Sequence, residues 1–162
     1  MTIMRVSLVG SPLDAEAAQA FATALIDAFA EVEVGSTSPE IRRGFLVHFE
    51  HVAATDLYMG DRPMAEASEA GKCAVVTAQV MAGPWNAAMK QALFSAVEAI
   101  VRAATDMPRR GNGADFWMTF VEVPEGGWGL GGRPVSIGQL APVFDEERQA
   151  RIRAHLAARN GG

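Results

Sequence analysis

Asp115-Phe-Trp-Met-Thr-Phe-Val-Glu-Val-Pro-Glu-Gly-Gly-Trp-Gly-Leu-Gly-Gly-Arg-Pro134 is the most informative segment of the chain, because a weaker copy of it lies 71 positions earlier. Sliding one copy onto the other without gaps aligns Phe45 with Phe116, Phe49 with Phe120, Val52 with Val123, Gly60 with Gly131, and Arg62-Pro63 with Arg133-Pro134. Such a repeat predicts two copies of one structural unit joined in tandem.

Each copy reads as a strand, a helix and a second strand. In the first copy we expect strands over residues 3–9 and 44–52, with a helix that begins at Ser11 and Pro12 and keeps apolar residues at helical spacing. In the second copy we expect strands over residues 73–82 and 115–123, with a helix from Gly83 to about Thr105. Two strands joined through a helix need a crossover connection, so each pair should be parallel.

These units predict an α/β (α+β) fold with a four-stranded sheet and two helices on one face. We expect one domain over residues 1–162, made of two β-α-β halves at about 2–64 and 73–137, a polar connector at 53–72 and a C-terminal helix at about 145–159. The sheet face without helices would carry Leu46, Trp117 and Val121. Because an apolar face of this kind needs a cover, the pattern predicts an oligomer.

Composition narrows the class of protein. The chain has 162 residues and a net charge of −5, which argues against a nucleic-acid partner. It contains no apolar run of the ~20 residues that a membrane helix needs, and no signal-peptide pattern, so we expect a cytoplasmic protein without a membrane partner. Cys73 is the only cysteine, and the three histidines are scattered. We therefore expect no metal site and no cofactor.

The strand ending in Val121-Glu-Val-Pro124 and the glycine turn around Trp128 resemble the second strand and following turn of the 4-oxalocrotonate tautomerase family. The resemblance covers roughly residues 2–137. It implies the fold of the tautomerase superfamily, which includes macrophage migration inhibitory factor. It also implies a homotrimer, because fused two-unit members of the superfamily assemble as trimers with their strands facing inward.

The resemblance implies general acid–base chemistry on a small enol, keto acid or unsaturated carboxylate, an isomerase-like activity. The family uses an amino-terminal proline as its base or acid, but Thr2 follows Met1 here and Ala74 takes the equivalent place in the second half. The places of the two family arginines are occupied by Pro12 and Pro84 and by Leu46 and Trp117.

Several residues could still support this chemistry. The base would be the Thr2 amine, exposed by methionine removal, or His48. The substrate carboxylate would be held by Arg43, Arg110 or Arg133. Trp117 and Trp128 would form the apolar wall of the pocket.

Each of these assignments has a simpler alternative. His48 also fits a hydrogen-bonded group at a subunit interface, and the arginines also fit solvated loops or salt bridges. The glycines of the segment from Gly127 to Gly132 satisfy G-x-G-x-x-G, but no helix signal follows, so a turn explains them better than a nucleotide site. Because the proline and both arginines are absent, a non-catalytic trimeric protein for ligand binding or assembly is the alternative function.

Overall fold

The computed structural model describes residues 1–67, 71–107 and 115–160, and it contains the strand–helix–strand order twice. The first half consists of β1 (Thr2–Val9), α1 (Ala15–Glu33), the short α2 (Pro39–Arg42) and β2 (Phe45–Val52). The second half consists of β5 (Cys73–Met81), α4 (Ala87–Thr105) and β6 (Phe116–Val123). The predicted elements are therefore present, with boundaries that differ by a few residues.

The helix starts are the main correction to these boundaries. Asp14 caps α1, where its carboxylate accepts a hydrogen bond from the backbone N–H of Ala17 at 2.8 Å. Asn86 caps α4 in the same way, with the N–H of Met89 at 2.9 Å. The expected starts at Ser11 and Gly83 were thus about three residues too early. An Asx side chain that reaches the third N–H defines the start more strongly than the prolines before it.

The sheet has the strand order β2-β1-β5-β6, with an antiparallel pair in the centre and a parallel pair on each side. Thr2 lies opposite Phe45, and Ala74 lies opposite Phe116, so the two parallel pairs share one register. In the central pair, Thr2 faces Val80 and Leu8 faces Ala74. Because Ala74 and Val80 are the repeat equivalents of Thr2 and Leu8, an approximate twofold rotation exchanges the halves.

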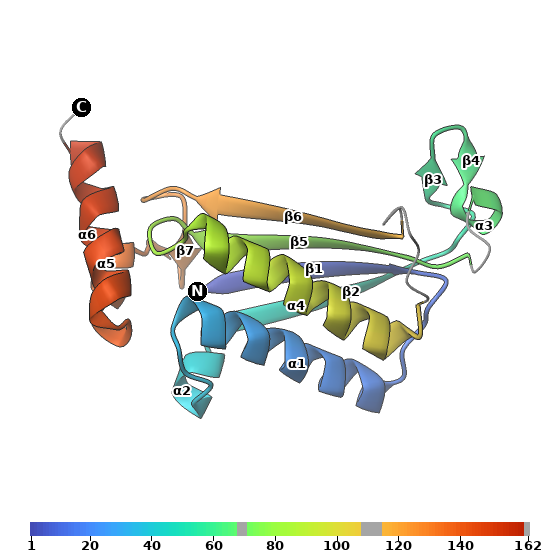
Figure 1. The fold of residues 1–162 in the computed structure, drawn as a ribbon, viewed down its shortest axis with the longest axis horizontal. Helices are drawn as coiled ribbons and strands as arrows, with labels where there is room; N and C mark the ends of the chain where they lie inside the picture. Colours follow the sequence, from blue (N-terminus) through green and yellow to red (C-terminus); the bar gives the residue numbers. More distant parts are fainter. Residues whose placement is uncertain (68–70, 108–114, 161–162) are drawn as a thin grey trace.

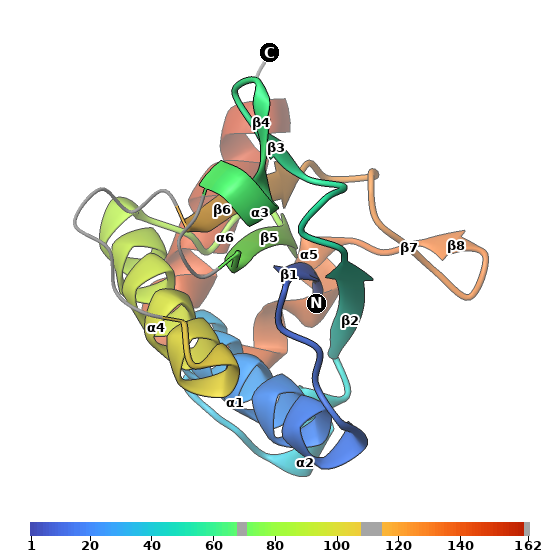
Figure 2. The same cartoon turned by 90° about the vertical axis from the view of Figure 1, so that its right-hand side faces the viewer.

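Both long helices cover the same face of the sheet and pack against each other, as Figures 1 and 2 show. Along α1 the fully buried positions include Phe21, Leu25 and Phe29, and α4 presents Leu93, Val97 and Val101 at the equivalent places. These side chains meet the inward residues of the sheet in one core. Burial of such apolar area supplies the main stabilisation of the fold.

The connections after β2 and β6 contain more structure than the sequence suggested. The expected polar connector at 53–72 includes a small hairpin of β3 (Tyr58–Met59) and β4 (Arg62–Pro63), followed by α3 (Met64–Ala67). The second half repeats this with β7 (Gly129–Leu130), β8 (Arg133–Pro134) and α5 (Ile137–Leu140). The sequence predicted only a polar connector for this segment, because two-residue strands are too short to show alternation.

The chain ends in η1 (Ala141–Val143) and α6 (Glu146–Asn160), which confirms the expected C-terminal helix. Figure 1 shows α5 and α6 at one end of the sheet, beside the N-terminus, and the hairpin of β3 and β4 at the opposite end. None of the helices among the described residues combines the length and hydropathy that crossing a bilayer requires.

The sheet face opposite α1 and α4 is open. Leu46 and Trp117 are each 56% exposed there, and Ile3 and Val121 are each 37% exposed. Arg5, His48 and Glu50 lie among them on β1 and β2. An apolar surface interrupted by an ionic cluster has the character of a protein–protein interface.

Candidate functional site

A cavity of about 250 Å³ lies where β1 and β2 begin, and it brings together three residues expected from the sequence, Thr2, Arg43 and Trp128. The parallel register places the start of β1 beside the start of β2, and the N–H of Thr2 donates to the carbonyl of Gly44 at 3.1 Å. We call this space the first cavity. Met1 and Leu46 also line it.

Trp128 reaches the first cavity from the other half of the chain. It is buried in a small apolar cluster with Met81, Ile137, Phe144 and Ile152, and Met1 packs against this cluster. The wall of the cavity is therefore held by α5 and α6 as well as by the glycine turn. Arg43 follows α2 and is exposed, so its guanidinium is the cationic side chain available to a ligand there.

A buried carboxylate lies behind the first cavity. Glu33, in the last turn of α1, has no exposed surface. Its Oε1 lies 3.1 Å from the amino-terminal nitrogen of Met1, and its Oε2 accepts a hydrogen bond from the hydroxyl of Thr2 at 2.7 Å. The amine is thus paired with a buried carboxylate, and the side chain of Thr2 is directed to the same Glu33.

A second cavity of about 410 Å³ occupies the equivalent place in the other half, at the opposite end of the sheet. Cys73, Trp117 and Leu57 line it, and they are the repeat equivalents of Met1, Leu46 and Trp128. The hairpin of β3 and β4 covers it as the hairpin of β7 and β8 covers the first cavity. None of its described lining residues carries a charge.

Cys73 is a poor nucleophile in this position. Burial, and secondarily the negative charge of Asp115, raises the pKa of its thiol to about 11. Because the thiolate is the reactive form, a thiol that stays protonated at neutral pH has little reactivity.

The structure separates the other candidates from these cavities. His48 lies on the open sheet face, with its Nδ1 3.9 Å from Glu50 Oε1, and it lines neither cavity. Arg133 is exposed on β8 and is not among the lining residues of either cavity. Arg110 lies outside the described residues. Trp117 lines the second cavity, so the two tryptophans do not form one wall.

Glu33 was missed by sequence reasoning, although a signal was present. Phe21, Leu25 and Phe29 recur every four residues along the buried face of α1, and Glu33 takes the next place in that series. A carboxylate at a buried helical position requires a partner. That partner comes from β1, 31 residues away in sequence, so the pattern indicated an unusual site but not its composition.

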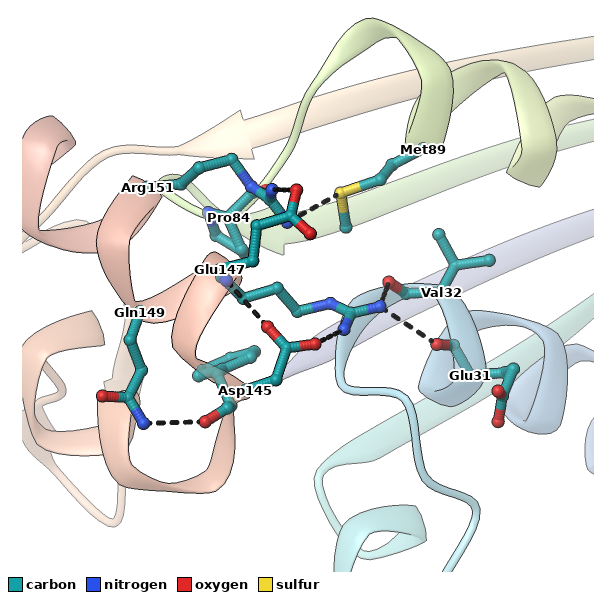
Figure 3. A network of polar contacts seen from close by, with 10 residues as sticks. Glu31, Val32, Pro84, Met89, Asp145, Glu147, Gln149 and Arg151 are labelled. Carbon is teal, nitrogen blue, oxygen red and sulfur yellow. Dashed lines mark hydrogen bonds and ion pairs between the residues drawn. The ribbon is translucent and has the colours of Figure 1, made fainter.

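Two arginines of α6 bind the rest of the chain, one at the end of α1 and the other at the start of α4 (Figure 3). A nitrogen of the Arg148 guanidinium lies 2.9 Å from the carbonyl oxygen of Val32 and 3.5 Å from that of Glu31. Arg151 donates to the carbonyl oxygen of Pro84 at 2.7 Å and contacts Met89. Arginine at free helix carbonyls is stabilising, so α6 supports the frame of the first cavity.

Comparison with known proteins identifies the fold. No family model and no curated protein matches the sequence. Among solved structures, a native fused 4-OT, named for 4-oxalocrotonate tautomerase, matches with a TM-score of 0.65 and 20% identity over 82% of this chain and 94% of its own. The Q0 fused 4-OT, described as a symmetric trimer, matches with a TM-score of 0.62 and 21% identity over 83% and 94%.

A further match, macrophage migration inhibitory factor of Toxoplasma gondii, has a TM-score of 0.62 and 13% identity over 82% of this chain and 99% of its own. At identities this low, a match shows a shared backbone fold and does not show a shared functional site. Since the matches span nearly the whole of each neighbour, the chain has the α+β fold of the fused 4-OT and migration inhibitory factor proteins.

Proposed function

We propose that this chain is a tautomerase-superfamily protein that acts on a small enol, keto acid or unsaturated carboxylate by general acid–base chemistry in the first cavity. The observation that carries the proposal is the meeting of an amino terminus, Arg43 and Trp128 around one space of about 250 Å³. A cavity of this size suits a small ligand. The fold shared with fused 4-OT proteins supports the same reading.

Each group has a distinct role in the proposed reaction. The guanidinium of Arg43 would hold the substrate carboxylate, because its planar fork matches two oxygens. Trp128 and Leu46 would contact the apolar part of the substrate. The terminal ammonium would give a proton to the carbon, and the resulting amine would then take the proton from the enol oxygen, which requires no metal or cofactor.

Three residues expected from the sequence have different roles in this proposal. The terminal nitrogen that contacts Glu33 is that of Met1, while Thr2 supplies the hydroxyl that binds Glu33. If methionine removal exposes the Thr2 nitrogen, that amine would take over the role. His48 and Arg133 would act only through a neighbouring subunit, because neither lines the cavity within one chain.

The direct test is turnover of phenylenolpyruvate, followed by the loss of enol absorbance, and of a halo-acrylate, followed by halide release. We expect Arg43→Ala to lower kcat/KM by about ten- to a hundredfold, since hydrogen bonds to charged groups contribute about 1.5–3 kcal/mol. The matched control is Arg42→Ala, which removes the same charge from the adjacent residue, whose guanidinium is paired with Asp27. Equal losses in both variants would contradict the proposal.

We further propose a homotrimer in which the open sheet face lies against sister chains. Neighbouring structures are described as trimers, symmetric for one fused 4-OT and asymmetric for others. The exposed Ile3, Leu46, Trp117 and Val121 support this arrangement. Light scattering should give about 52 kDa, three times the chain mass of 17.2 kDa, and Val121→Glu should shift the protein toward the monomer.

The alternative function is a non-catalytic trimer that binds a ligand or assembles on the same scaffold. The observation in its favour is that the amine is already paired with Glu33, so it is less free than an unpaired terminal base. Absence of turnover above buffer, together with saturable binding of phenylpyruvate that Arg43→Ala abolishes, would select this alternative. A Thr2→Pro variant that gained turnover would show that the cavity can still support catalysis.

A further inference from the structure

Glu33 is placed where a carboxylate is unfavourable. It is fully buried, and it lies in the last turn of α1, where the helix carbonyls present partial negative charge. Its position in the repeat is taken by Thr105 at the end of α4, whose hydroxyl bonds to the carbonyl of Val101 in its own helix at 2.7 Å. The fold therefore accepts a neutral residue at this place.

The difference between Glu33 and Thr105 parallels the difference between the two cavities. The first cavity has an amine and a threonine hydroxyl within reach of Glu33, at 3.1 and 2.7 Å. The second cavity has Cys73 and Ala74 at the equivalent positions, and neither needs an anionic partner. At this position of the repeat, a carboxylate is present only in the half where the terminal amine lies beside the cavity.

We propose that Glu33 is the positioning residue of the first cavity, whose carboxylate fixes the place of the terminal ammonium through the 3.1 Å contact. This inference rests on the proposed function for its consequence in catalysis. The ammonium meets a ligand as a proton donor, and its charge is balanced by Glu33. Arg43 is then the group that supplies net positive charge to a bound carboxylate.

The experiment measures the amine directly. Folded protein is exposed briefly to an acetyl N-hydroxysuccinimide ester, and acetylation of the amino-terminal peptide is followed by mass spectrometry. Lys90 in the same sample serves as the internal reference. An ammonium bound to a carboxylate must break that bond before its nitrogen can react. We expect Glu33→Gln to accelerate amino-terminal labelling about tenfold relative to Lys90.

The matched control is Glu31→Gln, which makes the same chemical change two residues away on the exposed side of α1. Glu33→Met provides a second variant, because an apolar side chain of similar volume is often tolerated in place of a buried charge. It should accelerate labelling as Glu33→Gln does. Labelling that is unchanged or slower in both variants would overturn the inference.

A second readout separates positioning from structural damage. Removing the negative charge of Glu33 leaves the ammonium free to attract an anion, so Glu33→Gln should bind phenylpyruvate severalfold more tightly. A purely structural residue would weaken binding when replaced. Faster labelling without any turnover by the unmodified protein would support the role of Glu33 and reject the proposed catalysis. Turnover by the unmodified protein, with labelling unchanged in the Glu33 variants, would support the proposed catalysis and reject the role of Glu33.

Discussion

The two halves of the chain share one backbone plan but place their buried polar groups differently. In the first half, Glu33 lies behind a cavity and contacts the chain terminus. In the second half, the buried pair is Arg102 and Asp115, which joins α4 to the start of β6 through two hydrogen bonds of 3.0 Å. The equivalents of that pair in the first half are Ala30 and Gly44, which carry no charge.

This difference shows that the repeated fold creates two similar spaces, while a few substitutions decide what each space can bind. The first cavity combines a terminal amine with Arg43, and the second is lined by uncharged residues around Cys73 and Trp117. Function resides in such groups and not in the scaffold. If this difference is real, the buried polar groups of the second half should stabilise the fold, while those of the first half should support ligand binding.

The largest expected effect concerns the ion pair of the second half. Asp115→Asn should lower the free energy of unfolding by about 3–5 kcal/mol, because it leaves the nearly buried Arg102 without its main charge partner. Urea denaturation at fixed protein concentration measures this. Glu98→Gln removes the other, more exposed partner of Arg102 and should cost less than about 1 kcal/mol. Equal losses would show that the pair is not a structural element of α4.

A smaller loss of stability should appear at alkaline pH, where the thiol of Cys73 ionises. Its pKa is raised by burial to about 11, above the ordinary value of 9.0, so the folded state holds the thiol proton more tightly than the unfolded state. The resulting stability is fully present below pH 9 and is lost as the pH rises through 11. Relative to Cys73→Ala, the protein should lose about 3 kcal/mol across this range. Parallel pH profiles of the two proteins would contradict the prediction.

The rate at which the Cys73 thiol reacts gives a second, kinetic test of its raised pKa. At pH 8, a disulfide reagent should modify folded Cys73 about a hundredfold more slowly than unfolded chain, which follows from the difference in thiolate fraction. Absorbance of the released thiolate measures the rate. Rapid modification of the folded protein would mean that the second cavity activates its cysteine, and the contrast between the cavities would then fail.

The smallest expected losses of stability come from removing the helix N-caps, and they should be equal in the two halves. Asp14→Ala and Asn86→Ala should each cost about 1 kcal/mol, because each removes one side-chain acceptor from the first turn of a 19-residue helix. Thermal unfolding followed by circular dichroism compares the two variants. A cost in only one half would show that the twofold relation of the backbone does not extend to the energetics of its helices.

The sequence alone determined the repeated unit, since strand alternation and the helical spacing of residues such as Phe21 and Leu93 are local properties. It also determined that one sheet face lacks a cover, because each unit has only one long helix. The aligned pair Phe45 and Phe116 indicated equivalent registers, and the structure places both opposite equivalent residues of β1 and β5.

Only the tertiary structure decided which residues share a cavity. Met1, Arg43 and Trp128 lie far apart in the sequence, and they meet because the parallel register aligns the strand starts while α5 and α6 hold the turn of the other half. The same geometry placed Trp117 and His48 elsewhere and brought Glu33 to Thr2. Local patterns carry no information on such long-range contacts, because these depend on how the two units pack together.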